Sequence, residues 1–164
     1  MSASGRWVAD TIRDEAEDPS PASGDFNLER FILAQDRTGT YERALGELRD
    51  GRKTSHWMRF VFPRISGLGN SEMSRKFAIS TCEEAGAYLQ HPVLGLRLME
   101  CTLTVLLYQG LDADDIFGDI DAQKLHSSMT LFMRAAPEVV AFARVLDQFF
   151  EGRSDPATDR LLRH

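Results

Sequence analysis

The sequence has 164 residues, of which 43% are hydrophobic, 27% are charged and 9% are aromatic. This composition is typical of one globular domain and excludes a collagen-like chain, a disulfide-rich miniprotein and a membrane-spanning bundle. Nineteen basic against twenty-five acidic side chains give a net charge of −6, which opposes general binding to nucleic acid or anionic lipid. We therefore expect neither nucleic acid nor a membrane as a partner.

The first 24 residues differ in composition from the rest of the chain. They hold two arginines against five acidic residues and end in a stretch rich in proline and serine. Such a composition breaks helices and buries little apolar surface, so we expect a flexible tail over residues 1–24 and a helical domain over residues 25–164. Trp7, Val8 and Ile12 could form a short docking helix in the tail. No apolar run typical of a secretory signal is present, which predicts a cytoplasmic protein.

Two short amphipathic helices are predicted after the tail, followed by a single helical turn. Asp25 or Asn27 is expected to cap the first helix. Thr40 is expected to cap the second, which ends at a glycine turn. Ser55 is expected to cap the helical turn, which Pro63 ends, although the aromatic and branched residues between them also fit a strand.

Capping patterns also mark the middle of the chain. A loop over residues 64–70 leads into a short helix over residues 71–77. Thr81 and Glu84 then form a capping box, in which each side chain bonds the backbone of the other. Pro92 is placed to begin a longer helix. Its apolar residues surround nearly the whole helix axis, so we expect neighbouring helices to enclose it.

The C-terminal third is predicted to be helical throughout. Asp112 and Asp121 are expected to cap two segments that are separated at Gly118. Asp155 and Pro156 open the last helix. No convincing pair of strands exists in the sequence. The pattern therefore predicts an all-α fold, a compact multihelical single domain around a central buried helix.

Four segments resemble domain-of-unknown-function family 1810, a group of single helical domains found mainly in bacteria and sometimes labelled calpastatin. The segments are Ser55–Met58 with Phe60–Pro63, Glu84–Ala85 with Ala87–Leu89, His91–Gly95 with Arg97–Leu98, and Ser127–Phe132. The resemblance extends from about Phe26 to Leu162. It implies a multihelical cytosolic domain and no established activity.

The chain departs from the expected family pattern at two positions. Arg59 stands where a tryptophan is expected and Arg64 where a glutamine is expected, and both changes add positive charge. The ligand preference of this chain need not match that of its relatives for this reason. The calpastatin label has no support, because an inhibitor of that kind is a disordered repeat protein and this chain is patterned to pack a core.

Positive charge is concentrated in one segment of this acidic chain. Residues 52–76 carry six basic side chains and one acidic side chain, so their net charge is +5 while the rest of the chain sums to −11. Gly67 and Gly69 belong to a loop that leads to Ser71 at a helix start, where free backbone N–H groups favour an anion. The basic side chains that could close on a phosphate or carboxylate are Arg64, Arg75 and Lys76.

Three more residues could take part in this site. His56 and Trp57 precede the loop, and an imidazole beside an indole could protonate or orient a ligand. The more ordinary interpretation is a buried Trp57 and a hydrogen-bonded His56 at the surface. Arg97 interrupts an apolar helix and needs either a ligand or a carboxylate, for which Glu100 is the nearest candidate. The loop arginines could likewise pair with the acidic residues between 112 and 121 instead of binding a ligand.

Other reactive groups are weaker candidates. Cys82 lies in a first helical turn, where the dipole favours a thiolate, but two adjacent glutamates oppose it. Ser127 and Ser128 lack a nucleophile motif and are expected to bond back to helix carbonyls or to line a pocket. The two cysteines and four histidines lack zinc-ligand spacing, and the acidic run lacks the glycine of a calcium-binding EF-hand loop. We expect no metal and no cofactor.

These observations predict a domain that binds a small anionic ligand similar to phosphate or a nucleotide. One alternative is an enzyme that acts on such a ligand with His56 as its acid or base. Another is a protein-interaction module without a small-molecule site, in which the tail or residues 112–121 form the contact.

Overall fold

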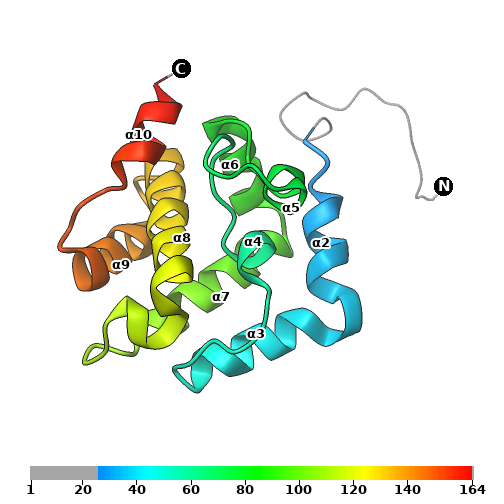
Figure 1. Ribbon diagram of the computed structural model, residues 1–164. Helices are drawn as coiled ribbons and strands as arrows, with labels where there is room; N and C mark the ends of the chain where they lie inside the picture. Colours follow the sequence, from blue (N-terminus) through cyan, green and yellow to red (C-terminus); the bar gives the residue numbers. More distant parts are fainter. Residues whose placement is uncertain (1–25, 164) are drawn as a thin grey trace.

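The computed structural model describes residues 26–163, which form helices around one apolar core (Figure 1). The elements are α2 (Glu29–Asp36), the short 3₁₀ helix η1 (Arg37–Gly39), α3 (Thr40–Arg49), α4 (Met58–Val61), α5 (Glu72–Lys76), α6 (Cys82–Gln90), α7 (Leu94–Leu106), α8 (Ala113–Ala135), α9 (Val140–Phe150) and α10 (Pro156–Leu162). Within residues 26–163 the only pairing of extended backbone is a bridge between Ile65 and Ile79. The predicted all-α fold is confirmed.

The second half of α8 is a deeply enclosed part of the domain. Every residue from Leu125 to Phe132 except His126 is buried, and α8 packs against α6, α9 and α10. The core around it contains the largest fully buried side chains, among them Trp57, Tyr88, Phe31, Phe62, Phe132 and Phe142. A buried helix is therefore present, but it is α8 and not the helix after Pro92, for which the sequence predicts this position.

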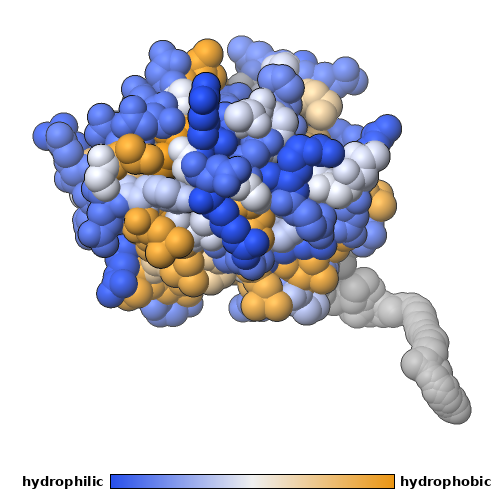
Figure 2. All heavy atoms as spheres, turned by 90° about the horizontal axis from the view of Figure 1, so that it is seen from below, coloured by the Kyte–Doolittle hydropathy of each residue, from blue (hydrophilic) through white to orange (hydrophobic). Residues whose placement is uncertain are grey.

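Helix α7 leaves one face open, contrary to the expectation that helices enclose it on all sides. Leu96 is 72% exposed, Leu103 51% and Leu107 74%, and their spacing of seven and four residues places them on one face of the helix. Figure 2, which shows the molecule from below, displays apolar side chains in separate patches between hydrophilic ones. Composition alone does not distinguish a half-open apolar helix from an enclosed one.

Arg30 fixes the chain at the start of α2. Its guanidinium donates five hydrogen bonds, to the backbone oxygens of Phe26, Asn27, Lys76 and Ala78 and to the carboxylate of Glu84. This one side chain therefore joins the beginning of the described chain to the end of α5 and to α6.

The caps predicted for the first two helices are wrong. Leu28 holds the N-cap position of α2, and no side chain bonds there, so Asn27 is not the cap; Asp25 lies outside the described residues. Gly39 precedes α3 in the left-handed conformation, which makes Thr40 the first helical residue. The Thr40 hydroxyl donates back to a carbonyl of η1 instead of accepting from its own helix.

Two further capping predictions fail because another partner takes the side chain. Ser55 donates its hydroxyl to Glu47 and makes no cap for α4. Thr81 does cap α6 and accepts from the amide of Glu84 at 3.1 Å. Glu84 does not complete the capping box, because its carboxylate accepts from the amide and hydroxyl of Ser80 and pairs with the arginine of α2.

Helix α8 is broken where the sequence predicts a break. Asp112 and Asp115 form a capping box at its start, and Gly118 has φ +79° and ψ 161°, which no helix tolerates. The helix resumes directly after Gly118, so Asp121 lies inside the second segment and does not cap it. The predicted cap of α10 is confirmed, since the Asp155 side chain accepts from the amide of Thr158.

Candidate functional site

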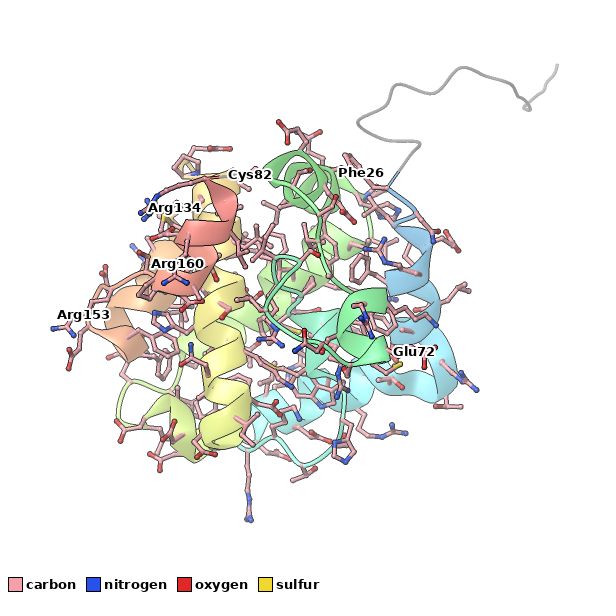
Figure 3. The ribbon with its side chains drawn as sticks, turned by 45° about the horizontal axis from the view of Figure 1, so that its top comes forward. Phe26, Glu72, Cys82, Arg134, Arg153 and Arg160 are labelled. Atoms are coloured by element: carbon pink, nitrogen blue, oxygen red, sulfur yellow. The ribbon has the colours of Figure 1, made fainter. Side chains whose placement is uncertain are left out.

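A small cavity of about 30 Å³ lies between α4, the loop after it, α5 and α8. This volume accommodates about two water molecules. In Figure 3 the label Glu72 lies at α5, and the label Arg134 lies at the C-terminal end of α8. The polar side chains that line the cavity are Arg59, Arg64, Ser66, Ser74, Arg75 and Lys124.

Two backbone hydrogen bonds hold the loop between α4 and α5 in place. The amide of Ser66 donates to the carbonyl of Ile79 at 2.8 Å, and the amide of Ile79 donates to the carbonyl of Arg64 at 2.9 Å. The backbone of Arg64 is therefore fixed, and its side chain lines the cavity from a rigid support.

The structure explains why glycine stands at both loop positions. Gly67 has a backbone conformation that favours glycine, and side chains approach Gly69 too closely for a Cβ atom. Gly67 has φ +107° and packs its backbone against Leu161. A Cβ at Gly69 would lie 2.6 Å from the Ser74 hydroxyl and 3.2 Å from Arg64 Nη2. Gly69 therefore lets a guanidinium and a hydroxyl approach the same point. Both glycines line the cavity, as the sequence predicts.

Ser71 caps α5, at the helix start that the sequence predicts, and its hydroxyl is used in that cap. Its hydroxyl accepts from the amide of Ser74 at 3.0 Å and contacts the Ser74 hydroxyl at 2.9 Å. Ser74 lines the cavity and Ser71 does not. The helix start therefore presents the second serine, and not the first, to a ligand.

Four cationic side chains line the cavity: Arg59, Arg64, Arg75 and Lys124. Arg59 Nε is buried and has no hydrogen-bond partner among the described residues. Burial lowers the pKa of Arg64, and the positive charge of Arg59 lowers it further. Burial also lowers the pKa of Lys124, in spite of the nearby Asp121, and the same two arginines add to that decrease. Bringing an anion here would replace lost hydration and reduce the mutual repulsion.

Acidic neighbours neutralise only part of this charge. Lys124 lies 3.7 Å from Asp121, which is itself 2.7 Å from Lys53. Between residues 26 and 163, neither Arg59 nor Arg64 forms an ion pair. The alternative in which the loop arginines are cancelled by residues 112–121 is therefore not what the structure shows.

Lys76 faces a different hollow on the other side of α5, so the structure does not bring it together with Arg64. Arg75 lines the small cavity, and Lys76 lines a hollow of about 710 Å³ beside α2. The apolar residues of this second hollow are Leu33, Ala34, Phe60, Met73 and Phe77. The short helix α5 therefore sends its two consecutive cations to separate places.

Trp57 belongs to the core and not to the cavity. It is 1% exposed, and its indole Nε1 donates to Glu47 at 2.8 Å. His56 is exposed, and neither residue lines the cavity. The ordinary interpretation of a buried Trp57 is confirmed, and His56 is not placed to protonate a ligand bound there.

Arg97 also lies away from the cavity, and its predicted pairing with Glu100 is wrong. Its guanidinium lies 2.8 Å from Asp36 and 3.2 Å from the amide oxygen of Gln35. Glu100 instead accepts from the hydroxyl of Tyr41 at 2.6 Å. The partners of Arg97 come from α2, far away in the sequence, so helical spacing could not have identified them.

Cys82 and Ser127 have structural surroundings, whereas the buried Ser128 hydroxyl has no partner among the described residues and does not bond back to a helix carbonyl. Burial raises the pKa of the Cys82 thiol, and Glu83 raises it further, so a thiolate is disfavoured. Ser127 donates to the carbonyl of Gln123 at 3.2 Å, the back-bonding expected of it, and to the carboxylate of Asp155 at 2.8 Å. In the part of the chain that the structure describes, no three metal-ligating side chains converge, and no helix has the length and apolar character of a membrane span.

These features define an all-α domain with a small cationic cavity beside a glycine-containing loop. Residues 25–162 match the family described as "Protein of unknown function (DUF1810)", and the chain belongs to this family. The crystal structure of the conserved hypothetical protein Rv1873 from Mycobacterium tuberculosis is similar, with 46% identity, a TM-score of 0.82, and coverage of 85% of this chain and 99% of the other. A comparison with curated proteins found no match.

The sequence pattern does not assign Arg59 or Lys124 to the site. Arg59 is marked only by its departure from the expected family pattern, and it proves to line the same cavity as Arg64, which departs from that pattern too. Lys124 comes from α8, and nothing in its neighbourhood along the chain relates it to the loop. Only the packing of α8 against the rest of the core brings it there.

Proposed function

We propose that this protein binds a small oxyanion, such as phosphate or the phosphate group of a metabolite, in the cavity between α5 and α8. The observation that carries the proposal is the buried Nε of Arg59, which has no partner among the described residues, next to Arg64 and Lys124. A buried polar group without a partner costs free energy, and native proteins retain few of them. An oxyanion would supply the missing acceptors and form charge-assisted hydrogen bonds.

Binding rather than catalysis is the better-supported function. The described lining of the cavity contains guanidinium, ammonium and hydroxyl groups but no histidine, cysteine or carboxylate that could act as acid, base or nucleophile. His56, the residue that an enzyme would need in this role, lies outside it. The proposed compartment is the cytoplasm, with which the free thiols of Cys82 and Cys101 agree.

The test is the thermal stability of the full chain in increasing inorganic phosphate, with potassium chloride at equal ionic strength as the reference. Phosphate at about one hundred times its Kd adds about 2.7 kcal/mol of stability and raises the Tm of a chain of this size by several degrees. Arg64→Met and Arg59→Met should abolish this rise.

Arg52→Met is the matched control, because Arg52 is exposed and lies outside the cavity, so that the same charge is removed elsewhere. Its Tm should rise with phosphate as that of the wild type does. The proposal is wrong if phosphate raises the Tm no more than potassium chloride does, or if the two cavity variants respond as strongly as Arg52→Met.

A further inference from the structure

A third space, which shares two lining residues with the small cavity, lies along α8. It has a volume of about 360 Å³ and is lined by Arg64, Asp119, Ile120, Gln123 and Lys124. Arg64 and Lys124 line both spaces, so an anion in either space can contact these two cations. A ligand whose anionic group contacts both cations would have the first turns of α8 after Gly118 beside it.

Charge is divided between these two spaces. The small cavity is lined by the cations, whereas the larger hollow also presents the carboxylate of Asp119 and the amide of Gln123. These two residues are four positions apart in a helix and so lie on the same face, and both are exposed. Neither makes a side-chain hydrogen bond or ion pair with Arg64 or Lys124 within the described chain. The hollow therefore offers the carboxylate acceptors of Asp119 and the amide of Gln123, which accepts and donates, beside the cations Arg64 and Lys124.

We propose that the ligand is the phosphate monoester of a hydroxyl-rich body, as in a sugar phosphate. This inference depends on the proposed oxyanion function: the phosphate occupies the cavity, and the hydroxyl groups bond Asp119 and Gln123. Carboxylates and amides are suited to pairs of hydroxyl groups because they accept, and the amide also donates. The volume of the hollow lies at the lower end of the range of small-molecule sites.

The same lining disfavours two other anions. A nucleotide base needs an aromatic or planar surface on which to stack, and the hollow contains no aromatic side chain. A diphosphate would bring its second charged group towards Asp119, where like charges repel. A single phosphate with an uncharged, hydroxylated body avoids both penalties.

The experiment is calorimetric titration of the full chain with inorganic phosphate, ribose 5-phosphate, ribose and adenosine monophosphate. Ribose 5-phosphate should bind about tenfold more tightly than inorganic phosphate, as expected for one or two additional net hydrogen bonds. Ribose alone should show no measurable binding. Adenosine monophosphate should bind more weakly than ribose 5-phosphate.

Two variants test the assigned residues. In Asp119→Asn/Gln123→Ala the ratio of the two dissociation constants, phosphate to ribose 5-phosphate, should fall towards one. This ratio is the readout because loss of a nearby negative charge changes both constants together. Asp114→Asn removes the same charge from an exposed position of α8 outside the hollow and should keep the wild-type ratio.

The outcomes separate this inference from the proposal on which it depends. If inorganic phosphate binds but ribose 5-phosphate binds no better, or if the ratio survives in the double variant, the inference fails and the oxyanion function stands. Tighter binding of adenosine monophosphate than of ribose 5-phosphate also overturns it. If no phosphate compound binds, the proposed function itself is wrong.

Discussion

One charged cluster lies before the short helix α4 and another includes a residue of α4. They differ in whether the buried charged group has hydrogen-bond partners. Before α4, the buried Glu47 carboxylate accepts from the amides of Thr54 and Ser55, from the Ser55 hydroxyl and from the Trp57 indole. In α4 itself, the buried Nε of Arg59 has no partner among the described residues. A satisfied charge of the first kind stabilises the fold, whereas an unsatisfied one costs free energy, which the proposed oxyanion would offset by supplying an acceptor.

The origin of the two clusters explains this difference. The partners of Glu47 all follow it within ten residues, so one loop wraps around the carboxylate. The cations of the cavity come from α4, the loop after it, α5 and α8. Their positions are set by the packing of separate elements, which holds like charges together although they repel.

Replacing Trp57 should have the largest effect. Trp57→Ala is expected to lower the free energy of unfolding by about 3–5 kcal/mol, because it leaves a large void and removes one donor from Glu47. Trp57→Phe keeps most of the ring volume and should cost less. Urea unfolding measures both variants. A loss below about 1 kcal/mol for Trp57→Ala would show that the Glu47 cluster does not support the fold.

The Glu47 cluster should also make stability depend on pH. Burial opposes ionisation of Glu47, but hydrogen bonds from Ser55, Thr54 and Trp57 outweigh it and lower the pKa from 4.5 to about 2. Because the folded pKa lies below the unfolded value, the contribution is complete above about pH 4.5 and is lost as the pH falls towards 2. Glu47→Gln should cost about 1–3 kcal/mol at neutral pH, and this cost should shrink across that window. A pH-independent cost in chemical unfolding would contradict the assignment.

Replacement of Arg59 in α4 is not expected to lower stability. Arg59→Met removes a buried charge without breaking a protein hydrogen bond within the described chain, so stability should stay constant or rise by about 1 kcal/mol. Thermal unfolding without phosphate measures this. A clear loss of stability would mean that Arg59 supports the fold and would remove the contrast between the clusters.

A similarly small effect is expected at the loop glycine. Gly69→Ala should cost about 1 kcal/mol and weaken phosphate binding, because the new methyl group displaces the Ser74 hydroxyl and crowds Arg64. Gly46 in α3 has open space around the same position, so Gly46→Ala should instead stabilise by about 0.5–1 kcal/mol. Thermal unfolding with and without phosphate distinguishes the pair. If Gly69→Ala bound phosphate as tightly as the wild type does, the loop would take no part in the binding site.

The sequence predicted helix boundaries correctly where the interacting residues are close together in the chain. The helix start at Ser71, the break at Gly118 and the cap at Asp155 depend on residues within a few positions of one another. The failures at Ser55 and Glu84 have a common cause, since each side chain is taken by a partner outside its own helix: Glu47 in one case and the arginine of α2 in the other.

The site was predictable in part for the same reason. Arg64, Gly67, Gly69 and Arg75 lie in one loop and its helix and reach one cavity. Lys76 does not join them, because consecutive residues of a helix point about 100° apart. A run of charges in a sequence therefore overstates the number that face a single ligand, and residues from a distant helix are missed.

The hydrogen bonding of Arg30 holds the first residues that the structure describes in place. Two of its five acceptors are the carbonyl oxygens of Phe26 and Asn27, at the same point where the family match starts, residue 25. Removal of the residues up to Asn27 would deprive the Arg30 guanidinium of two acceptors, although the same group also bonds α5 and α6. A lysine, with three donors and no planar fork, could not replace it. One side chain therefore attaches the first described residues to both α5 and α6.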